Sequence, residues 1–127
     1  MKALTKEDKL LSTVGLCARA RKLVMGTPMV CETLRIGKPA VHAVLEASDT
    51  SANTHKRLAD KCAYYQVPLY RLSADTVRLG RAVGKTGAVA AVGVTDKDLY
   101  RALSPHLPQQ EELRAGSQEE NEQKTDK

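Results

Sequence analysis

The chain has 127 residues, a formal net charge of +5, 42% hydrophobic residues, and neither tryptophan nor phenylalanine. A chain of this length forms one domain and buries about two-thirds of the surface exposed by its unfolded form, so it needs no metal or disulfide to fold. Its three cysteines are an odd number at wide spacing, which predicts buried thiols in a reducing compartment. Because neither a signal peptide nor a long apolar run occurs, we expect a soluble, cytoplasmic protein with no contact to membrane.

The charge is divided unevenly along the chain. Residues 104–127 hold six acidic and three basic side chains, a net charge of −3, so the remainder carries +8. A basic body favours a polyanionic partner, because each neutralised phosphate releases counterions; the alternative is a basic surface that serves solubility alone. Residues 105–127 contain few apolar side chains, so we expect a disordered acidic tail after a folded domain at residues 1–104. We expect residues 109–127 to be dispensable for folding.

The N-terminal third predicts two helices on either side of a short strand. Residues 5–8 have the spacing of a capping box and begin a first helix that ends near residues 18–20. Residues 23–25 follow as a short strand. Thr27 is expected to be the N-cap of a second helix, with Pro28 at its first position, where the missing N–H costs nothing.

The central part of the chain predicts a buried strand that feeds a helix. Val41, Ala43, Val44 and Leu45 are apolar, which is typical of a strand buried on both faces. The polar residues 46–53 then offer several side chains that could cap a helix continuing to residue 65. Such a strand and helix imply parallel pairing, with the polar loop at the carboxyl edge of the sheet, where ligands of these sheets bind.

Two further strands and two helices complete the chain. The predicted elements are a strand at 69–72, a helix at 75–83 capped by Ser73, a loop at 84–87, a strand at 88–94 and a last helix capped by Thr95. The alternation of helices and strands predicts an α/β fold, a three-layer α/β/α sandwich with a four-stranded mixed sheet.

No pattern of catalytic residues stands out. Residues 80–86 resemble a phosphate-binding P-loop, but only three residues, not four, separate the first glycine from the Gly-Lys-Thr sequence. In addition, the expected element before this segment is a helix, whereas a P-loop follows a strand. His42, His55 and His106 lack partners at metal-ligand spacing, and no Gly-x-Ser-x-Gly elbow occurs. We therefore expect a protein that is not an enzyme and uses no metal or cofactor.

The composition also limits how this chain could bind nucleic acid. Readers that stack bases need exposed aromatic side chains, and the four tyrosines lie in patterns typical of core or rim positions. Backbone and shape recognition remains, through helix N-termini, glycine-containing loops and basic side chains. The candidate RNA-binding residues are Arg21, Lys22, Gly26 and Thr27 on one loop and Arg81, Gly84, Lys85 and Thr86 on another. Both loops are expected at the same end of the sandwich as residues 46–53.

Several strings resemble a known family. The order of elements, with LCARARKLVMG, AVLEASDTSANTHKRLADKCAYYQVP and LGRAVGK, is similar over residues 9–103 to the YlxQ-type bacterial members of the ribosomal protein L7Ae family. The resemblance implies an α/β/α sandwich that binds kink-turn RNA, in some members as a ribosomal protein. In the kink-turn binders, a Gly-x-Asn-Glu-x-x-Lys segment at the start of the second helix contacts sheared G·A pairs. The loop after Leu-Gly-x-Ala-x-Gly holds flipped-out nucleotides.

This chain matches one of the two family motifs and departs from the other. Leu79, Gly80, Ala82 and Gly84 match the second motif. In the first motif Gly26 matches, but Pro28, Met29 and Glu32 stand where asparagine, glutamate and lysine are expected. Pro28 has no N–H and Glu32 would repel phosphate, so the resemblance implies RNA binding with altered or weaker kink-turn specificity.

Two hypotheses follow from the sequence. The first is a monomeric, ribosomal-protein-like RNA-binding protein that contacts ribosomal RNA or another structured RNA, and by that route the ribosome or another ribonucleoprotein. The second is a protein-interaction adaptor that keeps the fold but has lost kink-turn specificity and RNA contact.

Overall fold

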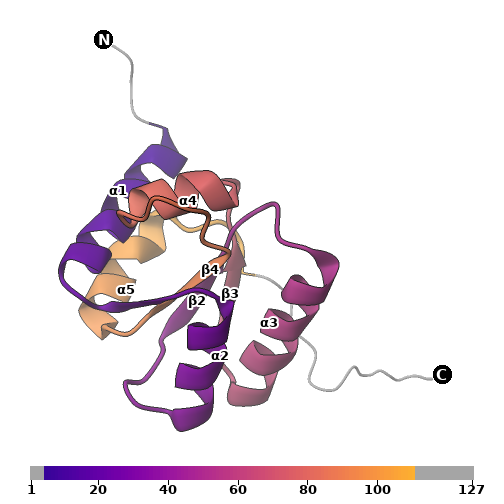
Figure 1. Ribbon diagram of the computed structural model, residues 1–127. Coiled ribbons are helices and arrows are strands. Elements are labelled where there is room, and N and C mark those ends of the chain that lie inside the picture. The colour runs from indigo at the N-terminus through magenta and orange to yellow at the C-terminus, as the bar shows by residue number, and fades with distance from the viewer. Residues whose placement is uncertain (1–4, 111–127) are drawn as a thin grey trace.

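The computed structural model describes residues 5–110 as one sheet between two layers of helices (Figure 1). In chain order the elements are α1 (Lys6–Arg19), β1 (Leu23–Met25), α2 (Thr27–Ile36), β2 (Ala43–Glu46), α3 (Ala52–Tyr65), β3 (Leu69–Arg71), α4 (Thr76–Ala82), β4 (Ala91–Val94), α5 (Lys97–Leu103) and a 3₁₀ turn, η1 (Ser104–His106). The strand order is β1-β4-β2-β3; β4 is antiparallel to both neighbours, and β2 and β3 are parallel. The predicted three-layer sandwich with a mixed sheet is confirmed.

The two faces of the sheet build two separate cores. In β2, Ala43 and Leu45 face α1, α4 and α5, whereas Val44 faces α2 and α3. In β4, Val92 and Val94 point to the first side and Ala91 to the second. This is the two-residue period of a strand with both faces covered, which explains why the sequence of these strands is almost continuously apolar.

The helix caps follow the predicted chemistry but not always the predicted residue. The capping box of Thr5 and Asp8 is confirmed, with the Asp8 N–H donating to Thr5 Oγ1 at 3.0 Å. Ser73 and Thr95 are not caps. The N-caps are Asp75 for α4 and Asp96 for α5. Each carboxylate accepts a hydrogen bond from the backbone N–H three residues later in the chain, that of Arg78 and that of Leu99. Charged carboxylates are favoured at these positions because they also interact with the helix dipole.

The packed chain continues beyond the expected domain end at residue 104. Residues 104–106 form η1, and Leu107 is 8% exposed within the core on the α1 side. The predicted tail at 105–127 therefore begins with packed residues, and its part at 111–127 lies outside the described residues. Within residues 5–110, none of the helices has both the length and the apolar character needed to cross a membrane.

Candidate functional site

Several loops meet at one edge of the sheet. β1, β2 and β3 end at this edge and β4 begins there, because β4 runs antiparallel to β1 and β2. Glu46 of β2 lies opposite Ala91 of β4, and Gly26, which follows β1, donates its N–H to the Ala91 carbonyl at 2.8 Å. The loops that follow β1 and β2 and the loop that precedes β4 are therefore neighbours, as the sequence predicted.

The start of α2 is bare of side-chain caps. Gly26, not Thr27, is the N-cap; its φ of 91° is one that glycine adopts readily, so the prediction of a Thr27 cap is wrong. Thr27 is instead the first helical residue. It is 9% exposed, and its Oγ1 has no hydrogen-bond partner within residues 5–110. Uncapped backbone N–H groups at the positive end of a helix suit an anion such as a phosphate.

The loop after α4 is held close against that helix. Gly84, with φ of 82°, donates its N–H to the Arg81 carbonyl at 3.1 Å, and Lys85 donates its N–H to the Gly80 carbonyl at 2.9 Å. Gly80 has to be a glycine, because a Cβ there would lie 2.1 Å from the Gly87 carbonyl oxygen. The glycines of the Leu-Gly-x-Ala-x-Gly motif thus shape the loop, while Lys85 stays exposed.

These two segments line one groove, which we name the loop groove. It has a volume of about 480 Å³ and is lined by residues 25–28 on one side and residues 85–90 on the other. Its lining residues combine apolar side chains, such as Met25 and Val89, with the basic Lys85 and with Thr27 and Thr86. The Thr27 hydroxyl itself is buried. Such a surface offers charge and donors to a phosphate, and apolar contact to a sugar or base.

The eight predicted site residues are divided among three places. Four of them, Gly26, Thr27, Lys85 and Thr86, line the loop groove, and Gly84 lies at the end of α4 beside it. Arg81 borders a different groove, between α1 and α4. Arg21 and Lys22 precede β1 and are at the other end of the sheet, where the Lys22 carbonyl accepts an N–H from Thr95, just after β4.

The prediction that Arg21 and Lys22 share a loop with Gly26 is therefore wrong. The three residues of β1 separate the two pairs, a distance of roughly 10 Å at the rise of a strand. Residues 23–25 were correctly predicted to be a strand. Even a strand of three residues crosses the sheet, so the residues before it and the residues after it lie at opposite edges of the sheet.

The polar loop after β2 is occupied with internal contacts. Glu46 is completely buried, and its carboxylate lies 2.7 Å from His55 Nδ1 and accepts a hydrogen bond from Thr50 Oγ1. Asp49 Oδ1 accepts the Thr76 N–H at 2.8 Å, and the Ser48 carbonyl accepts a hydrogen bond from Arg71 at 3.1 Å. In this loop, which the sequence placed at the ligand-binding edge of the sheet, the carboxylates of Glu46 and Asp49 therefore fix the starts of α3 and α4.

No arrangement within residues 5–110 suggests catalysis or a metal. No group of three or more His, Cys, Asp or Glu side chains in this range could hold a metal ion. All three cysteines are buried and free, as predicted, and burial raises the pKa of the Cys17 thiol and, together with nearby Cys31 and Glu46, raises that of Cys62 to about 12. The Cys17 and Cys62 thiols are therefore protonated at neutral pH, which makes them poor nucleophiles.

One tyrosine departs from the expected pattern. Tyr64 is 77% exposed on the outer side of α3, where it meets Tyr65 edge to face at 4.8 Å between ring centroids. The prediction of a core or rim position is wrong for Tyr64, because the inward side of α3 is defined by Leu58 and Cys62, and Tyr64 follows Cys62 by only two residues. It lies outside the loop groove.

Comparisons with known proteins agree with this architecture. The model of the Ribosomal protein L7Ae/L30e/S12e/Gadd45 family matches residues 8–104. A curated relative, RNA-binding protein YlxQ of Bacillus subtilis (strain 168), is 42% identical over 90 residues, which cover 71% of this chain and 86% of the relative. RNA-binding protein YlxQ of Enterococcus faecium is 32% identical over 85 residues, covering 67% and 80% of the two chains.

Two solved structures share the fold. A protein with unknown function from Bacillus halodurans C superposes with a TM-score of 0.70 at 38% identity, covering 77% of this chain and 95% of that one. The 15.5kD RNA binding protein of Giardia lamblia superposes with a TM-score of 0.64 at 19% identity, covering 82% and 87%. With the family match spanning nearly all of the described residues, the chain belongs to the Ribosomal protein L7Ae/L30e/S12e/Gadd45 family.

Proposed function

We propose that this protein binds a folded RNA of the kink-turn class and does so through the loop groove. The observation that carries the proposal is the convergence of two segments far apart in the sequence, the uncapped start of α2 and the exposed Lys85–Thr86 pair, on one groove. Membership of the family and the RNA-binding names of the two YlxQ relatives support it. We infer a non-enzymatic monomer that acts in the cytoplasm on ribosomal or another structured RNA.

The groove suits the backbone of an RNA bend better than its base edges. The Lys85 ammonium group and the N–H groups that open α2 are donors without acceptor capacity, so they match phosphate oxygens. Thr86 is exposed on the same groove, and a threonine hydroxyl can meet a 2′-hydroxyl or phosphate. Met25 and Val89 provide apolar contact for a nucleotide that leaves the stack.

The proposal is tested by titrating the protein with a kink-turn RNA and with the same RNA lacking its G·A pairs, over a series of salt concentrations. We expect both to bind and the intact kink-turn to bind more tightly. Lys85→Ala should weaken binding and lower the slope of log K against log salt by about one. Lys61→Ala is the matched control, because Lys61 is exposed on α3 outside the loop groove. Equal slopes for both variants would remove Lys85 from the interface.

The residues at the start of α2 also favour a second function, that of a protein-interaction adaptor. Pro28 and Met29 are exposed there, Met29 to 54%, and they stand where the family places hydrogen-bonding residues. An apolar surface at this position suits a protein partner, as in an adaptor that keeps the fold. Absence of binding to either RNA, together with co-purification of a protein but no nuclease-sensitive nucleic acid, would favour this alternative.

A further inference from the structure

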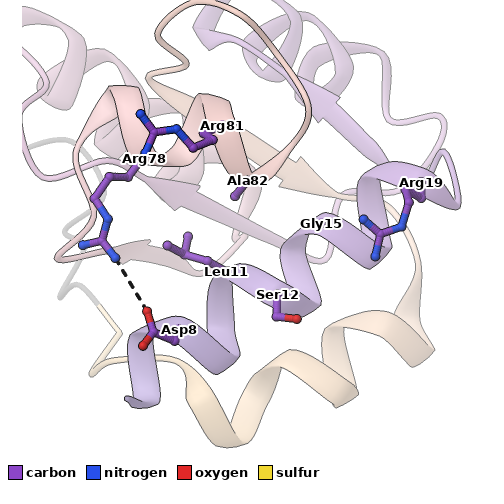
Figure 2. A pocket seen from close by; sticks show the side chains of 8 residues that line it. All are labelled: Asp8, Leu11, Ser12, Gly15, Arg19, Arg78, Arg81 and Ala82. Carbon is purple, nitrogen blue, oxygen red and sulfur yellow. Dashed lines mark ion pairs between the residues drawn. The ribbon is translucent and has the colours of Figure 1, made fainter. Parts of the chain in front are cut away.

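A second groove lies between α1 and α4, and we name it the helix groove (Figure 2). It has a volume of about 410 Å³, with Leu11, Ser12 and Gly15 of α1 and Ala82 of α4 among its lining residues. The helices approach closely, since a Cβ on Gly15 would lie 2.9 Å from the Ala82 carbonyl oxygen. The lining of the helix groove thus includes the small residues Ser12, Gly15 and Ala82 between longer side chains.

Three arginines from the two helices border this groove, and their charges are compensated unequally. Arg78 pairs with Glu7 and lies 3.8 Å from an Asp8 oxygen, so the end near the start of α1 is largely neutral (Figure 2). Arg19 and Arg81 are exposed and make no ion pair with any of residues 5–110. Arg19 in the last turn of α1 and Arg81 on α4 therefore give the helix groove uncompensated positive charge.

Arg81 of the helix groove adjoins the loop that lines the loop groove. Arg81 belongs to the last turn of α4, and its carbonyl accepts the N–H of Gly84 at 3.1 Å. The next residue, Lys85, donates its N–H to the Gly80 carbonyl at 2.9 Å and lines the loop groove. Arg81 thus joins the two grooves through a turn that is fixed to the end of α4.

We propose that the bound RNA extends from the loop groove over Arg81 into the helix groove, where its phosphate backbone lies against Arg19 and Arg81. This inference rests on the proposed function and lengthens its interface. Guanidinium groups present a planar fork that matches phosphate oxygens, and the groove has no aromatic side chain on which a base could stack. The link to the loop groove through Arg81 favours RNA over an acidic peptide. Beyond Arg19 the path leads toward Arg21 and Lys22, which follow it in the chain after Ala20.

Arg19→Ala tests the extension separately from the loop groove. The probe is a kink-turn RNA with long helical arms, titrated over a series of salt concentrations. We expect Arg19→Ala to weaken binding severalfold and to lower the salt slope by about one, while Arg19→Lys keeps the slope. Arg57→Ala is the control, because Arg57 is exposed on α3, on the other face of the sheet. Thermal melts of each variant check that the fold is intact.

A second pair of variants tests the groove without removing an arginine. Ser12 is exposed and lines the helix groove, so Ser12→Glu should repel phosphate and weaken binding more than Ser12→Gln, which adds similar bulk without the charge. RNA binding that responds to Lys85→Ala but to neither Arg19→Ala nor Ser12→Glu would overturn the extension and leave the proposed function standing. If the unchanged protein binds neither RNA, both the proposed function and its extension into the helix groove are overturned. Capture of a poly-glutamate peptide that depends on Arg19, with an unchanged RNA slope, would assign the groove to protein and overturn the RNA path.

Discussion

Replacing Gly80 by alanine sets two opposite effects against each other. In an ordinary helix the change stabilises, because alanine is favoured over glycine by about 1 kcal/mol. In α4 the added Cβ would meet the Gly87 carbonyl oxygen at 2.1 Å and the Gly87 carbonyl carbon at 3.2 Å. Both are backbone atoms, so no flexible side chain can move aside, and either α4 or the loop at 84–87 has to shift.

The loop is the part more easily displaced, but it is not free. The Lys85 N–H bonds to the Gly80 carbonyl at 2.9 Å, and the Val89 N–H bonds to the Thr76 carbonyl at 3.0 Å, so a shift strains or breaks these contacts. Overpacking costs about 1–3 kcal/mol and each lost hydrogen bond about 1 kcal/mol, which exceeds the gain in helix propensity. We expect Gly80→Ala to destabilise the fold by about 1–2 kcal/mol net, a fall in Tm of roughly 5–10 °C.

Urea unfolding and RNA titration of the same variant test this reasoning. The displaced loop carries Lys85 and Thr86, so RNA affinity should fall together with stability. Val77→Ala is the matched control in the same helix: Val77 is 55% exposed, and its replacement should change stability by less than about 0.5 kcal/mol. A Gly80→Ala protein that is as stable as the unchanged one and binds RNA equally well would refute the idea that Gly80 positions the loop.

Four further predictions concern other parts of the molecule. Thr27→Val removes a buried hydroxyl that has no partner within residues 5–110, so the free energy of unfolding measured in urea should stay the same or rise by about 1 kcal/mol. Glu46→Ala removes the buried carboxylate that binds His55 of α3, and we expect the free energy of unfolding to fall by about 2–3 kcal/mol. A lower urea concentration at the midpoint of unfolding would show this loss. The pKa of Cys62 is raised from 9.0 to about 12, so between these pH values the folded state keeps a proton that the unfolded chain releases. The contribution of this thiol to the free energy of unfolding is therefore complete below pH 9 and declines as the pH rises toward 12. Cys62→Ala should make this decline smaller when unfolding is measured over a series of alkaline pH values. A chain ending at Pro108 keeps the buried Leu107 and should fold and bind RNA at least as tightly, whereas a clear loss of affinity would assign residues 109–127 a direct role.

Much of the fold could be predicted because local signals and global burial agree. Apolar runs at 43–45 and 91–94 fill both faces of the sheet, and periodic helices alternate with them. Strand direction was harder, because a strand that runs antiparallel in the centre of the sheet has the same apolar composition as a parallel one. The capping residues were confused for a related reason: Ser73, Asp75, Thr95 and Asp96 have similar capping propensities, and only the path of the backbone selects among them.

The candidate site was predicted in part. Glycine and lysine in the string after Leu79 indicated a loop that could approach a ligand, and the structure brings that loop to the start of α2. Arg21 and Lys22 were misplaced because sequence distance is a poor measure of distance across a strand. The helix groove had no sequence signal, since Arg19 and Arg81 line one groove only because Gly15 allows α1 and α4 to pack closely.

The departures of α2 from the family motif change what the loop groove can read. Glu32 stands where the motif has lysine, but its carboxylate binds Arg35 through two hydrogen bonds, of 3.1 and 2.5 Å, and that contact lowers the pKa of Glu32. A phosphate near this turn therefore meets a pair that is nearly neutral rather than an isolated negative charge. Pro28 and Met29 supply no hydrogen bonds to base edges, so discrimination has to come from the N–H groups of α2, Lys85 and the shape of the bend. On this reasoning, binding should respond strongly to salt and to the bend of the RNA, and weakly to the identity of the paired bases.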